Sequence, residues 1–220
     1  MKLYFYIVII LLMTAQISFA EPDWDITVYP TSTVAYGNVT IDGKPAEAGD
    51  IVYAFVYQEC RGKQPVKEWE GKAIITMNIQ GLDDHEPVFF KVWDADADSV
   101  YEVSFTTFTK PNKDLGYPPD LLPINALTKG ITLFFPPETL EMHPYEVRQL
   151  DIAYYCNTSD QIKDVRIFGN ENLEVVPENL IINIAAPTVW VGEEEIEIEL
   201  LDEKDKVIEI ANILIIVKYN

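Results

Sequence analysis

Three carboxylates at alternate positions are the clearest candidates for chemistry in this sequence. Asp94, Asp96 and Asp98 are separated by alanines and lie between two strand-like apolar runs. Closed into a tight loop, they would offer hard oxygen ligands to Ca²⁺, which takes about six to eight oxygens. Ser99 stands where a helical calcium loop needs glycine, and Phe105 stands where it needs glutamate. Two interpretations stay open: a calcium site, and a solvated acidic hairpin.

Aromatic side chains form the second group of candidates. Trp69 lies in a charged turn between Lys67 and Glu70, and Trp24 and Tyr117 are the other candidate rings. Aromatic rings offer rigid area on which a sugar can stack, and neighbouring amides or carboxylates bind its hydroxyls. An exposed coplanar pair among these three rings would favour a glycan ligand, whereas burial of all three would favour a spacer.

Catalytic motifs are missing from the sequence. It has two histidines and shows no Gly-x-Ser-x-Gly elbow, no phosphate-binding glycine loop and no histidine pair with metal spacing. Thirty-six acidic residues leave a glycosidase carboxylate pair open, because its separation is a three-dimensional property. Two small sandwiches offer no obvious deep cleft. We therefore expect no enzyme activity, no catalytic residue and no cofactor other than a possible calcium ion.

The charge balance excludes two classes of partner. The 220 residues carry 16 Lys and Arg against 36 Asp and Glu, a formal net charge of -20. Such a chain repels phosphate backbones and anionic lipid headgroups, so neither nucleic acid nor a membrane surface is an expected partner. A hydrophobic share of 48% supplies packed cores. The expected ligand is a protein or a glycan at the cell surface.

Residues 1–20 have the pattern of a secretory signal peptide. Lys2 precedes an apolar run from Leu3 to Met13, and the small residues Ser18 and Ala20 precede Glu21. The run is too short for a bilayer span of about 20 residues. We expect cleavage after Ala20, no membrane insertion afterwards, and a secreted, extracellular or envelope-associated protein.

The two cysteines are 96 positions apart in a chain that is expected to be exported. Cys60 and Cys156 are placed in different domains by the strand pattern described next, and a disulfide needs Cα atoms within about 7 Å. A long-range disulfide and two separate buried thiols both stay open.

Strand-like segments rich in valine, isoleucine, tyrosine, phenylalanine and threonine dominate the chain. They are expected at 34–41, 51–59, 73–80, 88–93, 100–108, 131–135, 147–154, 163–168, 180–184, 194–201 and 207–218. Prolines at 111, 118, 119 and 123 indicate an ordered loop between two sets of strands. The predicted fold is all-β: two immunoglobulin-like β-sandwich domains in tandem at 21–128 and 129–220.

Motif order adds a resemblance for each unit. The first unit resembles a recurrent β-rich module of large secreted bacterial surface proteins through Tyr29-Pro30-Thr31, Tyr36-Gly37-Asn38, Glu59-Cys60-Arg61-Gly62, Phe90-Lys91-Val92-Trp93-Asp94 and Gly116-Tyr117-Pro118-Pro119. The second is similar to a cadherin-like or immunoglobulin-like bacterial tandem repeat through Leu133, Pro136-Pro137, Leu150-Asp151, Gly169-Asn170 and Trp190. The resemblance implies a non-catalytic module, here a structural or adhesive spacer. The alternative is a carbohydrate-binding module of a glycan-capturing or glycan-degrading system.

Overall fold

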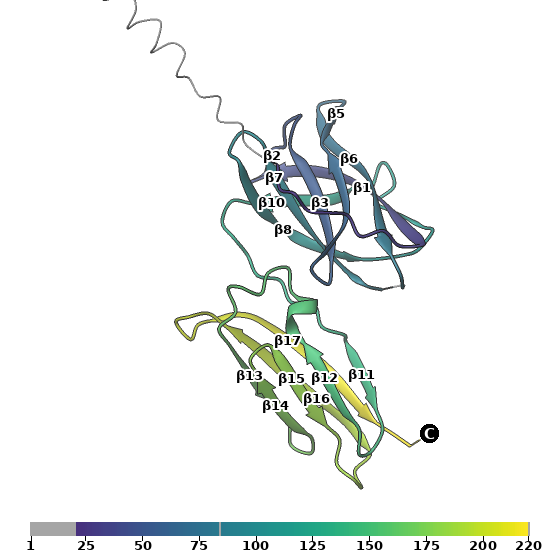
Figure 1. The fold of residues 1–220 in the computed structure, drawn as a ribbon, viewed down its shortest axis with the longest axis vertical. Coiled ribbons are helices and arrows are strands. Elements are labelled where there is room, and N and C mark those ends of the chain that lie inside the picture. The colour runs from purple at the N-terminus through teal and green to yellow at the C-terminus, as the bar shows by residue number, and fades with distance from the viewer. Residues whose placement is uncertain (1–20, 84, 220) are drawn as a thin grey trace, which may run out of the picture.

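The computed structural model describes residues 21–83 and 85–219. The predicted signal peptide lies outside these residues. Within them, regular structure consists of β-strands and one short 3-10 helix, η1 (Ile152–Tyr155). No described helix has the length and apolar character that a bilayer crossing needs. Figure 1 shows two β-rich bodies that follow one another along the long axis. The chain is all-β with two tandem β-sandwiches, and the predicted fold class is confirmed.

The first unit is built on one long, folded sheet. Its strands are β1 (Thr31–Ile41), β2 (Lys44–Pro45), β3 (Ile51–Val56), β4 (Glu59–Pro65), β5 (Lys67–Trp69), β6 (Lys72–Gly81), β7 (Pro87–Asp94), β8 (Ser99–Phe108), β9 (Asp114–Leu115) and β10 (Leu122–Leu127). Their order is β4-β3-β7-β8-β10-β1-β6-β5, with β2 and β9 paired to β1. The β1–β10 pair is parallel, so the Pro-rich stretch that follows β8 brings β10 beside the first strand of the sheet.

This sheet closes on itself around a hydrophobic core. A Cβ placed on Gly62 of β4 would lie 2.8 Å from the carbonyl oxygen of Asn78 on β6. The two halves of the sheet therefore approach each other closely, and side chains such as Val39, Ile75 and Phe90 fill the space between them. Strands β1 and β6 alternate buried and exposed side chains, as expected for sheets with one face on a core.

The N-terminal segment 21–30 covers the outer face of β3. All six residues of β3 are buried, because one face meets the core and the other meets this segment. The Trp24 ring packs edge-on against Tyr53 and Phe55 at centroid distances of 4.7 and 5.0 Å. The Tyr53 hydroxyl donates to the Glu21 carboxylate, which also pairs with Lys63. Burial is the main cause that raises the pKa of Tyr53, so its phenol stays protonated and remains a donor.

The second unit is a sandwich of a four-stranded and a three-stranded sheet. Its strands are β11 (Thr139–Met142), β12 (Val147–Asp151), β13 (Asp164–Phe168), β14 (Glu174–Glu178), β15 (Ile181–Ala185), β16 (Gly192–Leu201) and β17 (Val207–Val217). Their orders are β11-β17-β16-β13 and β12-β15-β14, the strand count of a constant-type immunoglobulin domain. On β16 the isoleucines at 196 and 198 are buried, and the glutamates at 195, 197 and 199 alternate with them.

Several predicted strands need correction. The expected strand 51–59 is a hairpin, because β3 ends at Val56 and β4 begins at Glu59. The expected strand 131–135 contributes only an isolated bridge between Phe134 and Cys156. The expected strand 147–154 ends at Asp151, whose carboxylate caps η1 by accepting from the Ala153 amide at 3.0 Å. The predicted domain boundary at 128/129 lies between β10 and β11.

Candidate functional site

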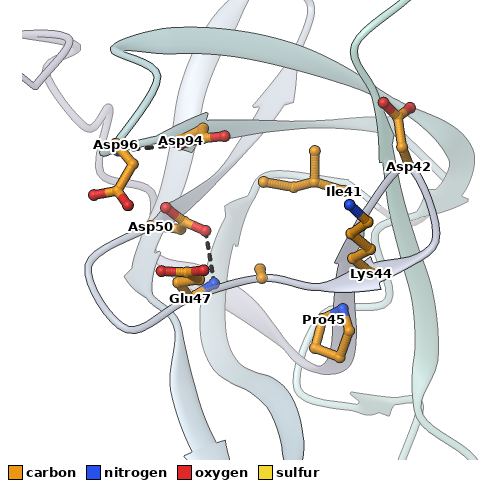
Figure 2. A pocket seen from close by; sticks show the side chains of 9 residues that line it. Ile41, Asp42, Lys44, Pro45, Glu47, Asp50, Asp94 and Asp96 are labelled. Carbon is orange, nitrogen blue, oxygen red and sulfur yellow. Dashed lines mark hydrogen bonds between the residues drawn. The ribbon is translucent and has the colours of Figure 1, made fainter.

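The acidic loop at 94–99 borders a hollow of about 270 Å³ in the first unit. Asp94 and Asp96 line it together with Asp42, Glu47 and Asp50, as Figure 2 shows. In that view Asp42 lies on the opposite side of the hollow from Asp50 and Asp96. The carboxylates are therefore spread around a rim and do not meet at one point.

Two of the three carboxylates that are predicted to bind calcium already accept hydrogen bonds from nearby residues. The Asp94 carboxylate accepts from the backbone amides of Asp96 and Ala97 at 3.0 and 2.9 Å, which closes the turn between β7 and β8. The Asp98 carboxylate accepts from Trp93 Nε1 at 3.4 Å and does not line the hollow. Asp50 is buried because it accepts from the Ala95 and Glu47 amides. These carboxylates act as turn and loop acceptors.

In the described part of the chain, no three His, Cys, Asp or Glu side chains are grouped closely enough to hold one metal ion. Calcium binding at Asp94, Asp96 and Asp98 stays a prediction. The loop hydrogen bonds favour the alternative of a solvated hairpin, because a calcium ion would have to compete with backbone donors for the same oxygens.

We expect millimolar Ca²⁺ to leave the unfolding temperature of the full mature chain unchanged. An ion that binds only the native state, at a concentration 100 times its dissociation constant, adds about 2.7 kcal/mol to the free energy of unfolding. That gain raises the unfolding temperature by several degrees. Calorimetry with calcium, with magnesium and with excess chelator measures it. A calcium-specific rise that Asp94→Asn and Asp96→Asn together abolish would contradict this expectation and establish the calcium site.

Trp24 is separated from the other two candidate rings. It belongs to the N-terminal segment, is half-buried, and packs on the outer cluster of Ile51, Tyr53 and Phe55. Its contacts with Tyr53 and Phe55 hold the N-terminal segment on β3, and the ring also borders a hollow of about 390 Å³.

Trp69 and Tyr117 are both exposed and lie on either side of Tyr36, which lines a shallow hollow with Trp69. Trp69 is 47% exposed and Tyr117 is 66% exposed. Trp69 lines a hollow of about 210 Å³ with Tyr36, Ile74, Thr76 and other residues. The Tyr117 ring meets Tyr36 edge-on at a centroid distance of 5.5 Å. Two of the three predicted rings are thus brought to the same face, and Tyr36 is a third ring that the sequence did not single out.

A hairpin turn of the first unit contacts the second unit. Tyr57 and Gln58 connect β3 to β4 with positive φ angles of 49° and 68°. Gln58 Nε2 donates to the carbonyl oxygens of Ala153 and Cys156 at 2.9 and 2.6 Å. The Tyr57 ring lies 5.8 and 6.1 Å from the rings of Tyr154 and Tyr155. The turn therefore contacts helix η1 of the second unit directly.

A second set of contacts fixes the segment between the units. The buried Asn157 amide donates to Glu102 of β8 at 3.0 Å and to the Ile131 carbonyl at 3.0 Å, and it accepts from Leu133 N at 2.7 Å. Phe135 N donates to the Tyr155 carbonyl at 2.9 Å. The connecting segment is thus hydrogen-bonded to the second unit, and the Glu102 contact ties both to the first.

The turn at this junction could not be predicted from residue types. Two-residue hairpin turns with two positive φ angles favour Asn-Gly or Asp-Gly, because bulky residues are strained there. Tyr57-Gln58 is neither of these pairs, so the sequence predicts one continuous strand through them. A strained backbone conformation persists only where surrounding contacts stabilise it, and here the contacts with η1 stabilise the turn.

The two cysteines are free thiols in separate cores. Burial raises the pKa of the Cys156 thiol to about 12, and it also raises the pKa of the Cys60 thiol. Both are therefore protonated, unreactive side chains at neutral pH. This arrangement favours the two-thiol alternative.

Comparisons with known proteins leave the family open. No protein-family model and no curated protein matches the chain. Among solved structures, it is similar to an endo-fucoidan hydrolase of glycoside hydrolase family 107, at 13% identity and a TM-score of 0.30, over 87% of this chain and 30% of that one. It is also similar to titin immunoglobulin tandem domains (10%, 0.27, over 86% and 97%) and to fibronectin(III)-like modules of Clostridium thermocellum CbhA (13%, 0.28, over 90% and 92%). At these TM-scores none of the likenesses carries an argument about function.

Proposed function

We propose that the protein is a non-catalytic, secreted or cell-surface module that acts as a structural or adhesive spacer. The contact of the Tyr57–Gln58 turn with η1 carries this proposal. A spacer must keep its two ends in a fixed relation, and a strained turn held by the neighbouring unit serves that purpose. Covered cores and an acidic surface keep such a chain soluble while its loops face a partner.

The junction combines direct hydrogen bonds with aromatic packing. Gln58 satisfies two carbonyl oxygens at the end of η1, and Asn157 reaches Glu102 across the junction. The Phe89 and Phe135 rings approach to 6.1 Å beside them. Short linkers without such contacts leave neighbouring domains free to reorient. We therefore infer that the two units move as one body.

Small-angle scattering of the full mature chain tests this proposal. Tyr57→Asn together with Gln58→Gly keeps a favoured hairpin turn but deletes both contacts with η1. We expect one arrangement of the units to fit the wild-type curve, and a mixture of arrangements to be needed for the double variant. Glu70→Asn is the matched control, because Glu70 also has a positive φ and precedes Gly71 in a turn away from the junction.

Two results would contradict the proposal that the protein is a spacer. One is a wild-type curve that itself requires many arrangements of the units. The other is a double variant whose curve matches the wild type, since the turn would then contribute nothing to the orientation. Calorimetry of the same samples shows that both units remain folded.

A carbohydrate-binding module of a glycan-capturing or glycan-degrading system is the second candidate. The exposure of Trp69 and Tyr117 favours it, because burial of all candidate rings would have left no ring for a sugar to stack on.

A further inference from the structure

The outer face of strands β10, β1, β6 and β5 places rings beside unbonded polar side chains. Strand register puts Tyr36 opposite Thr76 and Asn38 opposite Ile74 on this face. Ile74 in turn lies opposite Lys67 of β5. These side chains point outward, because the alternate residues of β1 and β6 are buried in the core.

The polar groups on this face are available to a ligand. The side chains of Asn38, Thr76 and Asn78 make no hydrogen bond with another described residue. Each is at least partly exposed, so each offers amide or hydroxyl donors and acceptors to solvent. Groups of this kind match the alternating donors and acceptors of sugar hydroxyls.

The charge on this face differs from that of the rest of the chain. The outward positions of β1, β5, β6 and β10 carry two lysines, Lys67 and Lys72, and no Asp or Glu. Acids lie at its border: Asp114 of β9 pairs with Val34, and the exposed Glu68 and Glu70 flank Trp69 in the chain. In a chain with 36 acidic residues, a sheet face that carries none suits an uncharged ligand. The net charge of -20 disfavours polyanions in the same place.

The rings give this face a surface on which a sugar can stack. Trp69 lies opposite Lys72 and borders the hollow together with Tyr36, and Tyr117 stands beside Tyr36. The hollow is smaller than the roughly 300–1,000 Å³ of pockets that enclose a small molecule. It therefore suits a ligand that lies along the surface and presents one ring to Trp69.

We propose that this face binds an uncharged polysaccharide, with a sugar ring stacked on Trp69 and its hydroxyls bound by Asn38, Thr76 and Asn78. This inference rests on the second candidate function and is independent of the spacer. Tyr117 and Tyr36 extend the platform for a neighbouring sugar unit. A proline-rich peptide is the competing occupant, because aromatic grooves also bind polyproline helices. The free amides and hydroxyls around the rings favour the sugar.

Affinity electrophoresis of the full mature chain in gels with hydroxyethylcellulose, galactomannan or xylan tests the proposal, with polygalacturonate as a charged comparison. We expect at least one uncharged polysaccharide to retard the wild type equally at low and high salt. Trp69→Ala should weaken this binding about tenfold, and Tyr117→Ala by a smaller factor. Tyr145→Ala is the control, because Tyr145 is 71% exposed in the second unit. Calorimetry confirms that each variant is folded.

The outcomes separate this inference from the function on which it rests. Retardation that Trp69→Ala leaves unchanged would overturn the site and leave carbohydrate binding standing. Retardation only by polygalacturonate, lost at high salt, would overturn the uncharged ligand. Failure of all three uncharged polysaccharides would overturn both the site and the carbohydrate candidate. Binding of a polyproline peptide that Trp69→Ala abolishes, without polysaccharide binding, would assign the face to a peptide.

Discussion

Replacement of Gly116 by alanine is expected to destabilise the first unit by about 2–4 kcal/mol. Gly116 has a φ of 68°, and a Cβ there would lie 2.5 Å from the Tyr36 carbonyl oxygen and 2.6 Å from Leu122 N. Both neighbours are backbone atoms of paired strands, so neither can move without breaking the sheet. The left-handed conformation costs about 1–2 kcal/mol for any side chain, and the overpacking adds about as much again.

Gly71→Ala separates the two contributions. Gly71 has a similar φ of 75°, but a Cβ there would meet no atom within 4 Å. We expect this control to lose only about 1 kcal/mol, the conformational part. Calorimetry of both variants and the unchanged protein, each without the predicted signal peptide, gives both values. Equal losses in the two variants would show that the backbone around Gly116 relaxes and that the clash is not decisive.

The same glycine positions the aromatic platform. It lies between Leu115, which is buried, and Tyr117, which stands edge-on to Tyr36. A shifted turn would move Tyr117 away from Tyr36 while Trp69 on β5 stays in place. Loss of stability and loss of polysaccharide binding should therefore occur together in Gly116→Ala but not in Gly71→Ala.

Local patterns predicted most strands but not their pairing. Alternation of apolar and polar residues identified β16 and β6, because each has one face on a core. The parallel pairing of β1 with β10 joins residues such as Val39 and Ile124, which are far apart in the chain. The periodicity within each strand does not predict this pairing, because the pairing depends on how the whole sheet closes around its core.

The candidate site was predicted only in part for the same reason. Exposure of Trp69 and Tyr117 follows from polar and Pro-rich surroundings, so composition indicates it. Tyr36 occupies an ordinary outward position in an alternating strand. Only the pairing of β1 with β6, which places Tyr36 opposite Thr76, shows that it lies on the same face as Trp69. For the Asp94 loop the sequence leaves a calcium site and a solvated hairpin both open, and the structure adds two backbone amides that donate to the Asp94 carboxylate.

Replacement of Arg61 by methionine is expected to cost about 3–5 kcal/mol, the usual cost of breaking a buried ion pair. Arg61 is 3% exposed, its Nε lies 2.7 Å from Glu59 Oε2, and its Nη2 lies 3.9 Å from Glu86 Oε1. The guanidinium also stacks on the Tyr29 ring at 3.7 Å. Methionine fills much of the same volume, so the loss comes from charge and not from a cavity.

Glu86 is the reason that the loss is large. It is 5% exposed and accepts from the backbone amides of Leu82 and Asp83 at 3.0 and 3.3 Å. Without Arg61 its carboxylate stays buried with no countercharge. An amide at this position removes that charge while retaining one acceptor oxygen, so Arg61→Met with Glu86→Gln should lose less than Arg61→Met alone.

Urea unfolding of the four proteins in this double-mutant cycle measures the coupling between the two residues. Arg148→Met is the surface control, because Arg148 pairs with Glu146 but is 50% exposed, and it should cost less than about 1 kcal/mol. Additive losses in the cycle would contradict the argument, since they would mean that Glu86 does not need Arg61. A positive coupling would show that the β4 strand, which begins at the junction turn, is anchored to the segment between β6 and β7 through a buried charge pair.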